Sequence, residues 1–139
     1  MVRAFTTINI INKETGKIDK VMDLPIVYYN FCFDYDGNCY MVCPKTKSET
    51  EDVAVGTNLV KFDSDFNKLS VIECKSQWGE SYIQRYFGTM SFDYTTGNLW
   101  WIPVGNQGAT TLYSVNTETG IYEGKSWFNL GNSFVGLTI

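Results

Sequence analysis

The chain has 139 residues, a formal net charge of −4 and 16% aromatic residues, which suits one domain with a sizeable core built from β-sheets. Its eleven Lys and Arg residues form no cluster, which argues against nucleic acid or an anionic membrane surface as a partner. No segment approaches the roughly 20 consecutive apolar residues of a membrane-spanning helix, so we also expect no membrane insertion.

Alternating apolar segments and turn residues predict the strands in chain order. We expect a hairpin over residues 5–23, four strands over about 28–75, four more over about 88–127 and a last strand over 133–139. No segment shows a convincing helical period. The predicted fold class is therefore all-β, with four-stranded antiparallel repeats.

Two connecting segments differ in character from these strands. The polar "KTKSETEDVAVG" (45–56) predicts a solvated loop, whereas "SQWGESYIQRYFG" (76–88) predicts a structured connection. By contrast, the strands "CYMVC" (39–43) and "LWWIPV" (99–104) are apolar at consecutive residues. That pattern is typical of sheets that are covered on both faces.

The chain contains two families of similar segments. Asn12, Asp63 and Asn116 hold the same place in the first family, at steps of 51 and 53 residues along the chain. In the second family, "FCFDYDGNCYMV" (31–42) is similar to "MSFDYTTGNLWWI" (90–102). Internal similarity at such spacings indicates a repeat architecture.

The segment that begins at Asp34 has two interpretations. Asp34, Asp36 and Asn38 alternate as the first ligands of a helix–loop–helix calcium loop do. That loop also needs Gly at its sixth position and Glu at its twelfth, where this chain has Cys39 and Lys45. Asp, Gly and Asn also supply the positive φ and the local hydrogen bonds of a tight hairpin. We therefore predict a turn and no metal site.

The sequence gives little support for catalysis. It contains no His, which excludes Ser–His and Cys–His nucleophile systems within this chain. Carboxylate pairs remain available for glycoside chemistry, but backbone capping explains the acids that fall in predicted hairpins. These acids are Asp34, Asp36, Asp63, Asp65 and Asp93. We expect no catalytic residue.

The four cysteines are Cys32, Cys39, Cys43 and Cys74. If residues 39–43 form a strand, Cys39 and Cys43 lie about 13 Å apart, too far for a disulfide or for adjacent corners of one zinc site. Buried free thiols are the preferred prediction. A disulfide between Cys32 and Cys74 is the alternative.

Repeats with an Asp, Gly-Asn and aromatic hairpin followed by Asn-x-x-Thr-Gly resemble bacterial β-propellers of the quinoprotein-like and NHL-like type, over nearly the whole chain. The segment from Ser114 to Gly120 is similar to the small-x-Asp-x-x-Thr-Gly pattern of the quinoprotein repeat, with Asn116 in place of Asp. The docking Trp that ends that repeat falls at Gly124, and the chain lacks the adjacent cysteine pair associated with the quinone in several such dehydrogenases. We therefore expect no cofactor.

The resemblance implies an incomplete propeller of about two and a half blades. Residues 5–23 correspond to half a repeat, 28–75 and 88–127 to full repeats, and 133–139 to the first strand of a further repeat. Open sheet faces of this kind imply a homo-oligomeric ring or the remainder of a longer propeller. The resemblance favours an extracytoplasmic location, and the sequence by itself leaves the compartment open.

The candidate recognition surface is an aromatic cluster in the connection 76–88. Trp78, Tyr82, Arg85 and Tyr86 combine aromatic faces with a polar group, which suits sugars or peptides. Packing between sheets is the alternative for these aromatic residues. The sequence thus predicts a noncatalytic binding or scaffolding module with a glycan or protein ligand. The alternative function is a fragment of a propeller enzyme that acts on glycans.

Overall fold

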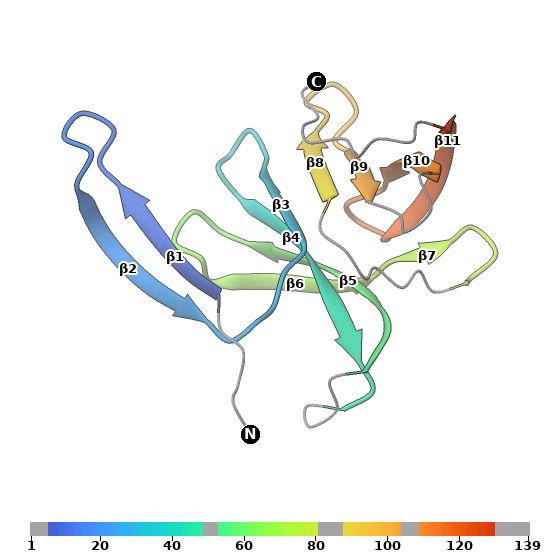
Figure 1. Cartoon of the computed structure of the whole chain (residues 1–139), viewed down its shortest axis with the longest axis horizontal. Helices are drawn as coiled ribbons and strands as arrows, with labels where there is room; N and C mark the ends of the chain where they lie inside the picture. Colours follow the sequence, from blue (N-terminus) through green and yellow to red (C-terminus); the bar gives the residue numbers. More distant parts are fainter. Residues whose placement is uncertain (1–5, 49–52, 81–87, 104–108, 130–139) are drawn as a thin grey trace.

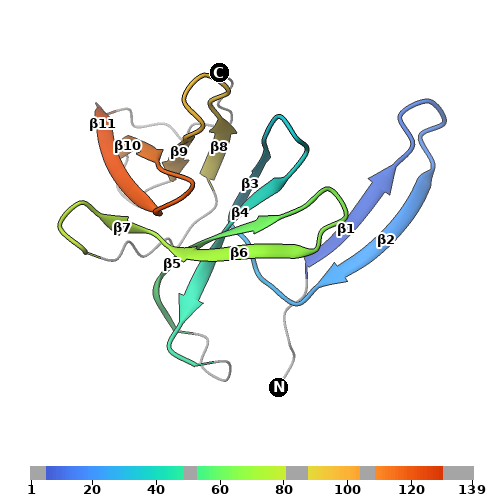
Figure 2. The same ribbon diagram turned by 180° about the vertical axis from the view of Figure 1, so that it is seen from behind.

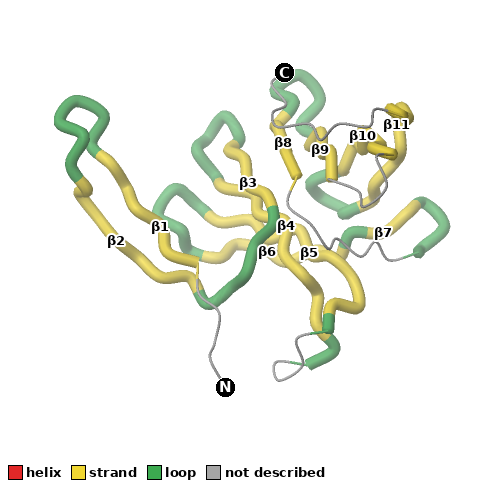
Figure 3. The backbone as a smooth tube through the Cα atoms, in the orientation of Figure 1, coloured by secondary structure: helices red, strands yellow, loops and turns green. Residues whose placement is uncertain are grey.

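The computed structural model describes residues 6–48, 53–80, 88–103 and 109–129, which form strands joined by turns and loops (Figure 3). These residues contain no helix, so the all-β prediction is confirmed. Accordingly, the described ranges hold no helix with the length and apolar character needed to cross a membrane. The strand predicted over 133–139 lies outside the described residues.

The strands form three sheets that follow one another in chain order (Figures 1 and 2). The first sheet is the hairpin of β1 (Thr6–Ile11) and β2 (Ile18–Leu24). The middle sheet has the order β3 (Asn30–Phe33), β4 (Cys39–Thr46), β5 (Ala54–Phe62) and β6 (Lys68–Glu73). The third sheet has the order β7-β11-β10-β9-β8, with β7 (Lys75–Ser76), β8 (Gly88–Phe92), β9 (Leu99–Pro103), β10 (Ala109–Val115) and β11 (Ile121–Asn129). Neighbouring strands are antiparallel except β7 and β11, which are parallel.

The middle hairpin is longer than the sequence predicts. Lys45 pairs with Gly56 and Thr46 pairs with Ala54, so the prediction of a solvated loop over 45–56 is wrong at both ends. Figure 1 shows β4 and β5 extending together beyond the other sheets. The end of β4 carries Lys45 and Thr46, and the start of β5 carries Ala54 and Gly56, so neither end shows the long apolar run by which a strand is recognised in the sequence.

Five hairpin loops open with an Asn or Asp whose side chain accepts backbone N–H groups of the same loop. Asp34 Oδ1 accepts from the N–H groups of Asp36 and Asn38 at 3.0 and 2.9 Å. Asp34 Oδ2 accepts from Asn38 Nδ2 at 2.8 Å. The corresponding residues of the other loops are Asn12, Asp63, Asp93 and Asn116. The predicted turn at Asp34 is confirmed, since both carboxylate oxygens accept hydrogen bonds from residues of the same loop.

The middle sheet is covered on both faces, as β4 shows most clearly. Cys39, Met41 and Cys43 pack in a cluster that also contains residues of the first sheet. Tyr40 and Val42 point the other way, into a cluster shared with the third sheet. All five side chains are buried. Consecutive apolar residues therefore mark a doubly covered strand here, as predicted.

The cluster between the middle and third sheets fixes the relative position of these two sheets. Leu99 and Trp101 of β9 are completely buried in it, together with Val42 and Leu59 of the middle sheet. Packing of two apolar sheet faces is the main source of stability in such a fold. The strands that come closest across this interface are β3 and β8.

All four cysteines are buried and free. The prediction of buried free thiols is confirmed, and the alternative of a disulfide between Cys32 and Cys74 is wrong. Burial raises the pKa of each thiol to about 12. These thiols remain protonated at neutral pH and behave as small apolar side chains.

Candidate functional site

The edge strands β3 and β8 lie side by side without forming a ladder (Figure 1). At one end, the Gly88 N–H donates to Asn30 Oδ1 at 2.7 Å. Just beyond the other end, the Tyr94 hydroxyl donates to the Phe33 carbonyl oxygen at 3.3 Å. Because Asn30 and Gly88 each begin a strand, β3 and β8 run in the same direction. Two polar contacts therefore tie the edges together at both ends.

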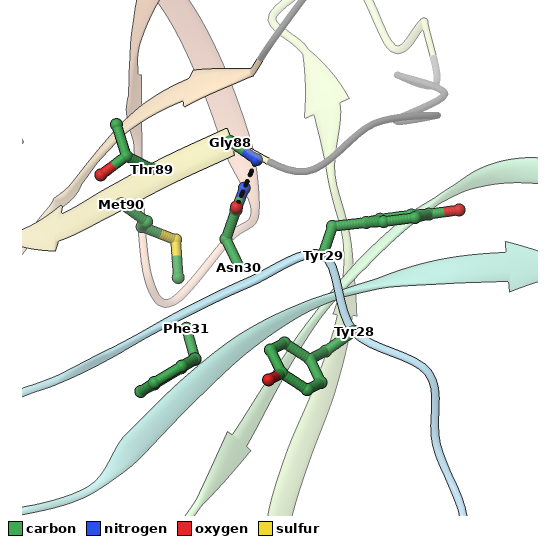
Figure 4. Close-up of a pocket in the computed structure, with 7 residues that line it drawn as sticks. All are labelled: Tyr28, Tyr29, Asn30, Phe31, Gly88, Thr89 and Met90. Atoms are coloured by element: carbon green, nitrogen blue, oxygen red, sulfur yellow. Dashed lines mark hydrogen bonds between the residues drawn. The ribbon is translucent and has the colours of Figure 1, made fainter. Parts of the chain in front are cut away.

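A pocket of about 290 Å³ opens where β3 and β8 begin (Figure 4). Its lining residues are Tyr28, Tyr29, Asn30, Phe31, Gly88, Thr89 and Met90. In Figure 4 the rings of Tyr28 and Phe31 lie near each other below Asn30, and the Met90 side chain extends from β8 toward β3. This volume is at the lower end of the range for small-molecule sites. It suits a group of about the size of one sugar ring.

Asn30 supplies the distinctive polar group of this pocket. Only 4% of its surface is exposed. The hydrogen bond from Gly88 identifies Oδ1 and so fixes the orientation of the amide. Nδ2 is then buried and has no hydrogen-bond partner among the described residues. A buried donor without a partner costs about 1–3 kcal/mol, so an acceptor that enters the pocket gains from meeting it.

An aromatic row, made of the half-buried Tyr28 and the exposed Phe31 and Phe33, runs along the face of β3 opposite Asn30. Tyr28 and Phe31 meet edge to face with ring centres 5.7 Å apart, and Phe31 and Phe33 do so at 5.9 Å. Phe31 is 48% exposed and Phe33 is 44% exposed. Exposed rings beside a pocket suit the C–H faces of sugars or apolar groups of a peptide.

A second aromatic group lies at the far end of β3, where the β3–β4 and β8–β9 loops meet. The rings of Tyr35 and Tyr94 contact edge to face at 5.5 Å, and both are exposed. Tyr94 also contacts Phe92 at 5.3 Å, and Phe92 stacks on the buried Tyr40 at 5.8 Å. This group connects the two loop tips to the core.

The pocket lining carries no acidic or basic side chain, whereas charges gather at the far end of β3. There Lys61 Nζ lies 3.6 Å from Asp34 Oδ2 and 5.1 Å from the centre of the Tyr40 ring. The hydrogen bond to Tyr40 and the charge of Asp34 raise the pKa of Lys61. Burial opposes the charge of Asp34, but the hydrogen bonds from Asn38 and the neighbouring Lys61 outweigh burial and lower its pKa. The uncharged lining favours a neutral ligand.

Both carboxylate oxygens of Asp93 accept hydrogen bonds from residues in or next to its own hairpin loop. Its Oδ1 accepts from the Thr95 hydroxyl at 2.6 Å, and its Oδ2 accepts from the Thr96 hydroxyl at 2.7 Å. Oδ2 also accepts from Trp100 Nε1 at 3.2 Å. These hydrogen bonds, chiefly those from the two threonine hydroxyls, hold the pKa of Asp93 well below its usual range. A carboxylate with this pKa is ionised at neutral pH and is a weak base.

Trp78 lies at the tip of a small loop that follows β7. Ser76 Oγ accepts from the N–H groups of Trp78 and Glu80 at 3.3 and 3.1 Å, which closes the loop. The Trp78 residue is 80% exposed. Because β7 and β8 are the opposite edges of the third sheet, Trp78 and the pocket lie at opposite edges.

The other residues of the predicted recognition cluster are Tyr82, Arg85 and Tyr86. They lie outside the described residues, so the structure places only Trp78 of the four.

The pocket residues were not singled out by the sequence. Asn30 stands within an aromatic run, "YYNF" (28–31), at the start of a short strand. A polar amide among apolar residues on a strand with a buried face is the one available signal. Its partner, Gly88, is 58 residues away and carries no matching motif.

No protein-family model, curated protein or solved structure matches this chain. Its function is accordingly inferred from the geometry of its own residues.

Proposed function

We propose that this protein is a noncatalytic binding module whose ligand, a neutral glycan or a peptide, occupies the pocket between β3 and β8. The observation that carries this proposal is the buried Nδ2 of Asn30, which has no partner among the described residues, on a residue that lines the pocket between β3 and β8. Native proteins pair nearly all buried donors, so an unpaired donor in a pocket is a reasonable place for a ligand oxygen.

The chemistry of the nearby groups supports binding rather than catalysis. Asp34, Asp63 and Asp93 hold their own loops, and their hydrogen bonds keep these acids ionised. The four thiols are buried and protonated. The alternative is part of a propeller enzyme that acts on glycans, with its catalytic acids contributed by further blades.

The scaffold of the proposed module is a partial propeller. Two arrangements support this proposal: the middle sheet is a four-stranded antiparallel meander, and β8 to β11 form another. The first strands of these meanders are parallel neighbours, which is the relation between successive blades of a propeller. Exposed apolar residues of the first sheet, among them Ile11, Ile18 and Val21, are then covered by a further sheet. That sheet comes from another copy of the chain or from the remainder of a longer propeller.

The Trp78 loop is a second candidate surface for the same function. The exposed Trp78 indole lies at the tip of a loop that is closed by hydrogen bonds, and an exposed aromatic ring of this kind favours ligand binding at this loop. Tyr82, Arg85 and Tyr86 belong to the same proposed surface by sequence.

Screening on arrays of neutral glycans and peptides, followed by calorimetric titration of each hit, tests the proposal. We expect a ligand whose affinity falls at least tenfold in Phe31→Ala. Leu69→Ala is the matched control, because Leu69 is an exposed apolar residue on the opposite edge strand of the middle sheet. Loss of binding in Trp78→Ala alone would move the site to the β7 loop. Hydrolysis of a bound glycan would support the enzyme alternative, and binding to no ligand on either array would overturn the proposal.

A further inference from the structure

The loops that follow β1, β5 and β10 are built alike. They open with Asn12, Asp63 and Asn116, whose N–H groups donate to carbonyl oxygens of the same loops at 2.8, 3.0 and 2.9 Å. The register of the β1–β2 ladder also shifts between the last two residues of β1, as the register of the β5–β6 ladder does between the last two residues of β5. The hairpin of β1 and β2 is therefore the counterpart of β5 with β6 and of β10 with β11.

The counterparts of β1 have a neighbour that β1 lacks. β5 pairs with β4 on one edge, and β10 pairs with β9 on the corresponding edge. Among the described strands, β1 pairs only with β2 (Figure 1). The backbone groups on its other edge have no hydrogen-bond partner in the described part of the chain. The free edge of β1 is thus the edge that an antiparallel strand occupies in both counterparts.

This free edge also lacks the protection that two other outer strands carry. β2 contains Asp19, Lys20 and Asp23, and β6 contains Lys68 and Glu73. β1 has the sequence Thr-Thr-Ile-Asn-Ile-Ile, which holds no charge. Charged side chains on an edge strand oppose the addition of a further strand. An uncharged edge rich in β-branched residues favours that addition.

Phe33 gives independent evidence for a strand beside β1. The similarity of the segments 31–42 and 90–102 makes Phe33 the counterpart of Phe92. Phe92 stacks on the Tyr40 ring of β4, with ring centres 5.8 Å apart. Phe33 lies on the face of β3 that points toward the first sheet, where it is 44% exposed. The counterpart of β4 that would cover Phe33 is the strand that β1 lacks.

We propose that the free edge of β1 accepts an antiparallel strand from a partner polypeptide. β4 begins opposite Phe62, the last residue of β5, and β9 begins opposite Val115, the last residue of β10. By the same register, the partner strand begins opposite Ile11, the last residue of β1. Its backbone groups pair with those of β1, as in other cases of strand addition.

The internal counterparts also give the chemistry of the partner strand. Its second residue corresponds to Tyr40 of β4 and to Trp100 of β9, so an aromatic ring at this position packs on Phe33. β4 and β9 each begin with a run of apolar residues, so the partner strand carries apolar residues on both faces. One face extends the apolar cluster that already lies between the first and middle sheets.

A second copy of the chain offers no such strand from its described residues. Its β4 and β9 are each paired on both edges. Its outer strands β2 and β6 carry charges. The partner is therefore a different segment. Because β1 does not line the pocket between β3 and β8, this inference does not depend on the ligand proposed for that pocket.

Hydrogen exchange of the full chain, followed by nuclear magnetic resonance, tests the inference with a peptide copy of β4. The peptide has the sequence of residues 38–47, with Ser in place of both cysteines. We expect saturable binding that slows exchange of the edge amides of β1 at least tenfold, because they gain hydrogen bonds. Exchange in β6, a charged outer strand, should not change.

Three outcomes of this experiment would overturn the inference and leave the proposed pocket standing. The first is no binding of the peptide at its highest soluble concentration. The second is binding that leaves exchange in β1 unchanged. The third is protection of β1 that rises with protein concentration in the absence of peptide, because a second copy would then be the occupant.

Two substitutions test the expected aromatic contact. Tyr40→Ala in the peptide removes the ring that packs on Phe33, and Phe33→Ala in the protein removes the other side of the contact. We expect each to lower the affinity at least tenfold. Tyr35→Ala in the protein is the matched control, because Tyr35 is an exposed aromatic residue of the loop that follows β3. Unchanged affinity in folded Phe33→Ala would overturn the inference, and if that variant does not fold, the two peptides on the unaltered chain decide.

Discussion

The Gly88 N–H donates a hydrogen bond to Asn30 Oδ1 across 2.7 Å, and these residues begin the first strands of two different sheets. The bond ties the edges of the middle and third sheets together. It also orients the Asn30 amide so that Nδ2 is left for a ligand. One side chain thus links the packing of the sheets to the proposed site.

The contact between the β10–β11 loop and the middle sheet predicts a difference between two glycines. Gly120 and Gly16 both have φ near +70°, at the same place in similar loops. A Cβ at Gly120 meets the Glu73 carbonyl oxygen at 2.5 Å and Ile72 Cγ2 at 2.7 Å, whereas a Cβ at Gly16 meets nothing within 4 Å. We expect Gly16→Ala to cost about 1–2 kcal/mol through the left-handed backbone alone. Gly120→Ala should cost clearly more, as measured by urea unfolding, and equal costs would show that the loop does not pack against β6.

The depressed pKa of Asp93 predicts a loss of stability in acid. Its pKa is lower in the folded chain than the usual value of about 3.9, so its contribution to stability is fully present above about pH 4 and is lost as the pH falls through the folded pKa. Asp93→Asn keeps one acceptor but cannot titrate. We therefore expect the urea midpoint of this variant to fall less steeply between pH 5 and pH 2 than that of the unaltered chain. If the urea midpoints of the two proteins fall equally steeply with pH, this role of Asp93 is contradicted.

The buried thiols predict slow alkylation of the folded chain. Burial raises each thiol pKa to about 12, so the thiolate fraction at pH 8 is about a thousandfold lower than that of an exposed cysteine. Iodoacetamide should therefore label the cysteines rapidly only in denaturant, as followed by mass spectrometry. Because these pKa values are raised, the contribution of the thiols to stability is present below about pH 8.5 and is lost as the pH rises. Rapid labelling of any cysteine in the native chain would contradict its burial.

The exposed apolar residues of the first sheet predict self-association. Ile11 and Val21 are both more than half exposed on this hairpin. Apolar surface of this kind favours burial against another sheet. We expect light scattering at micromolar concentration to give a mass above that of one chain, and Ile11→Thr with Val21→Thr to reduce it. A stable monomer at every concentration would contradict the proposed partial propeller.

The parts of the fold that depend on local patterns were predictable from the sequence. The apolar run of β4 predicted a doubly covered strand, and the Asp34 segment predicted a turn, because both depend on side chains close together in the chain. The extension of β4 and β5 toward Thr46 and Ala54 was missed, because these strand ends lack a run of large apolar residues.

The pocket was not predictable in the same way. It arises where Asn30 meets Gly88, and that contact depends on how two sheets pack rather than on any local pattern. The exposed Trp78 was a visible aromatic signal, but the fold places it at the opposite edge of the third sheet from the pocket.

The most direct test of the proposed site is nuclear magnetic resonance of the ¹⁵N-labelled chain during titration with the tightest-binding glycan or peptide from the arrays. A ligand oxygen at the pocket should shift the Asn30 side-chain NH₂ signals and the Gly88 N–H signal together and saturably, with the exposed Asn9 side chain unmoved. Saturable shifts elsewhere, with Asn30 and Gly88 unchanged, would contradict a binding site between β3 and β8.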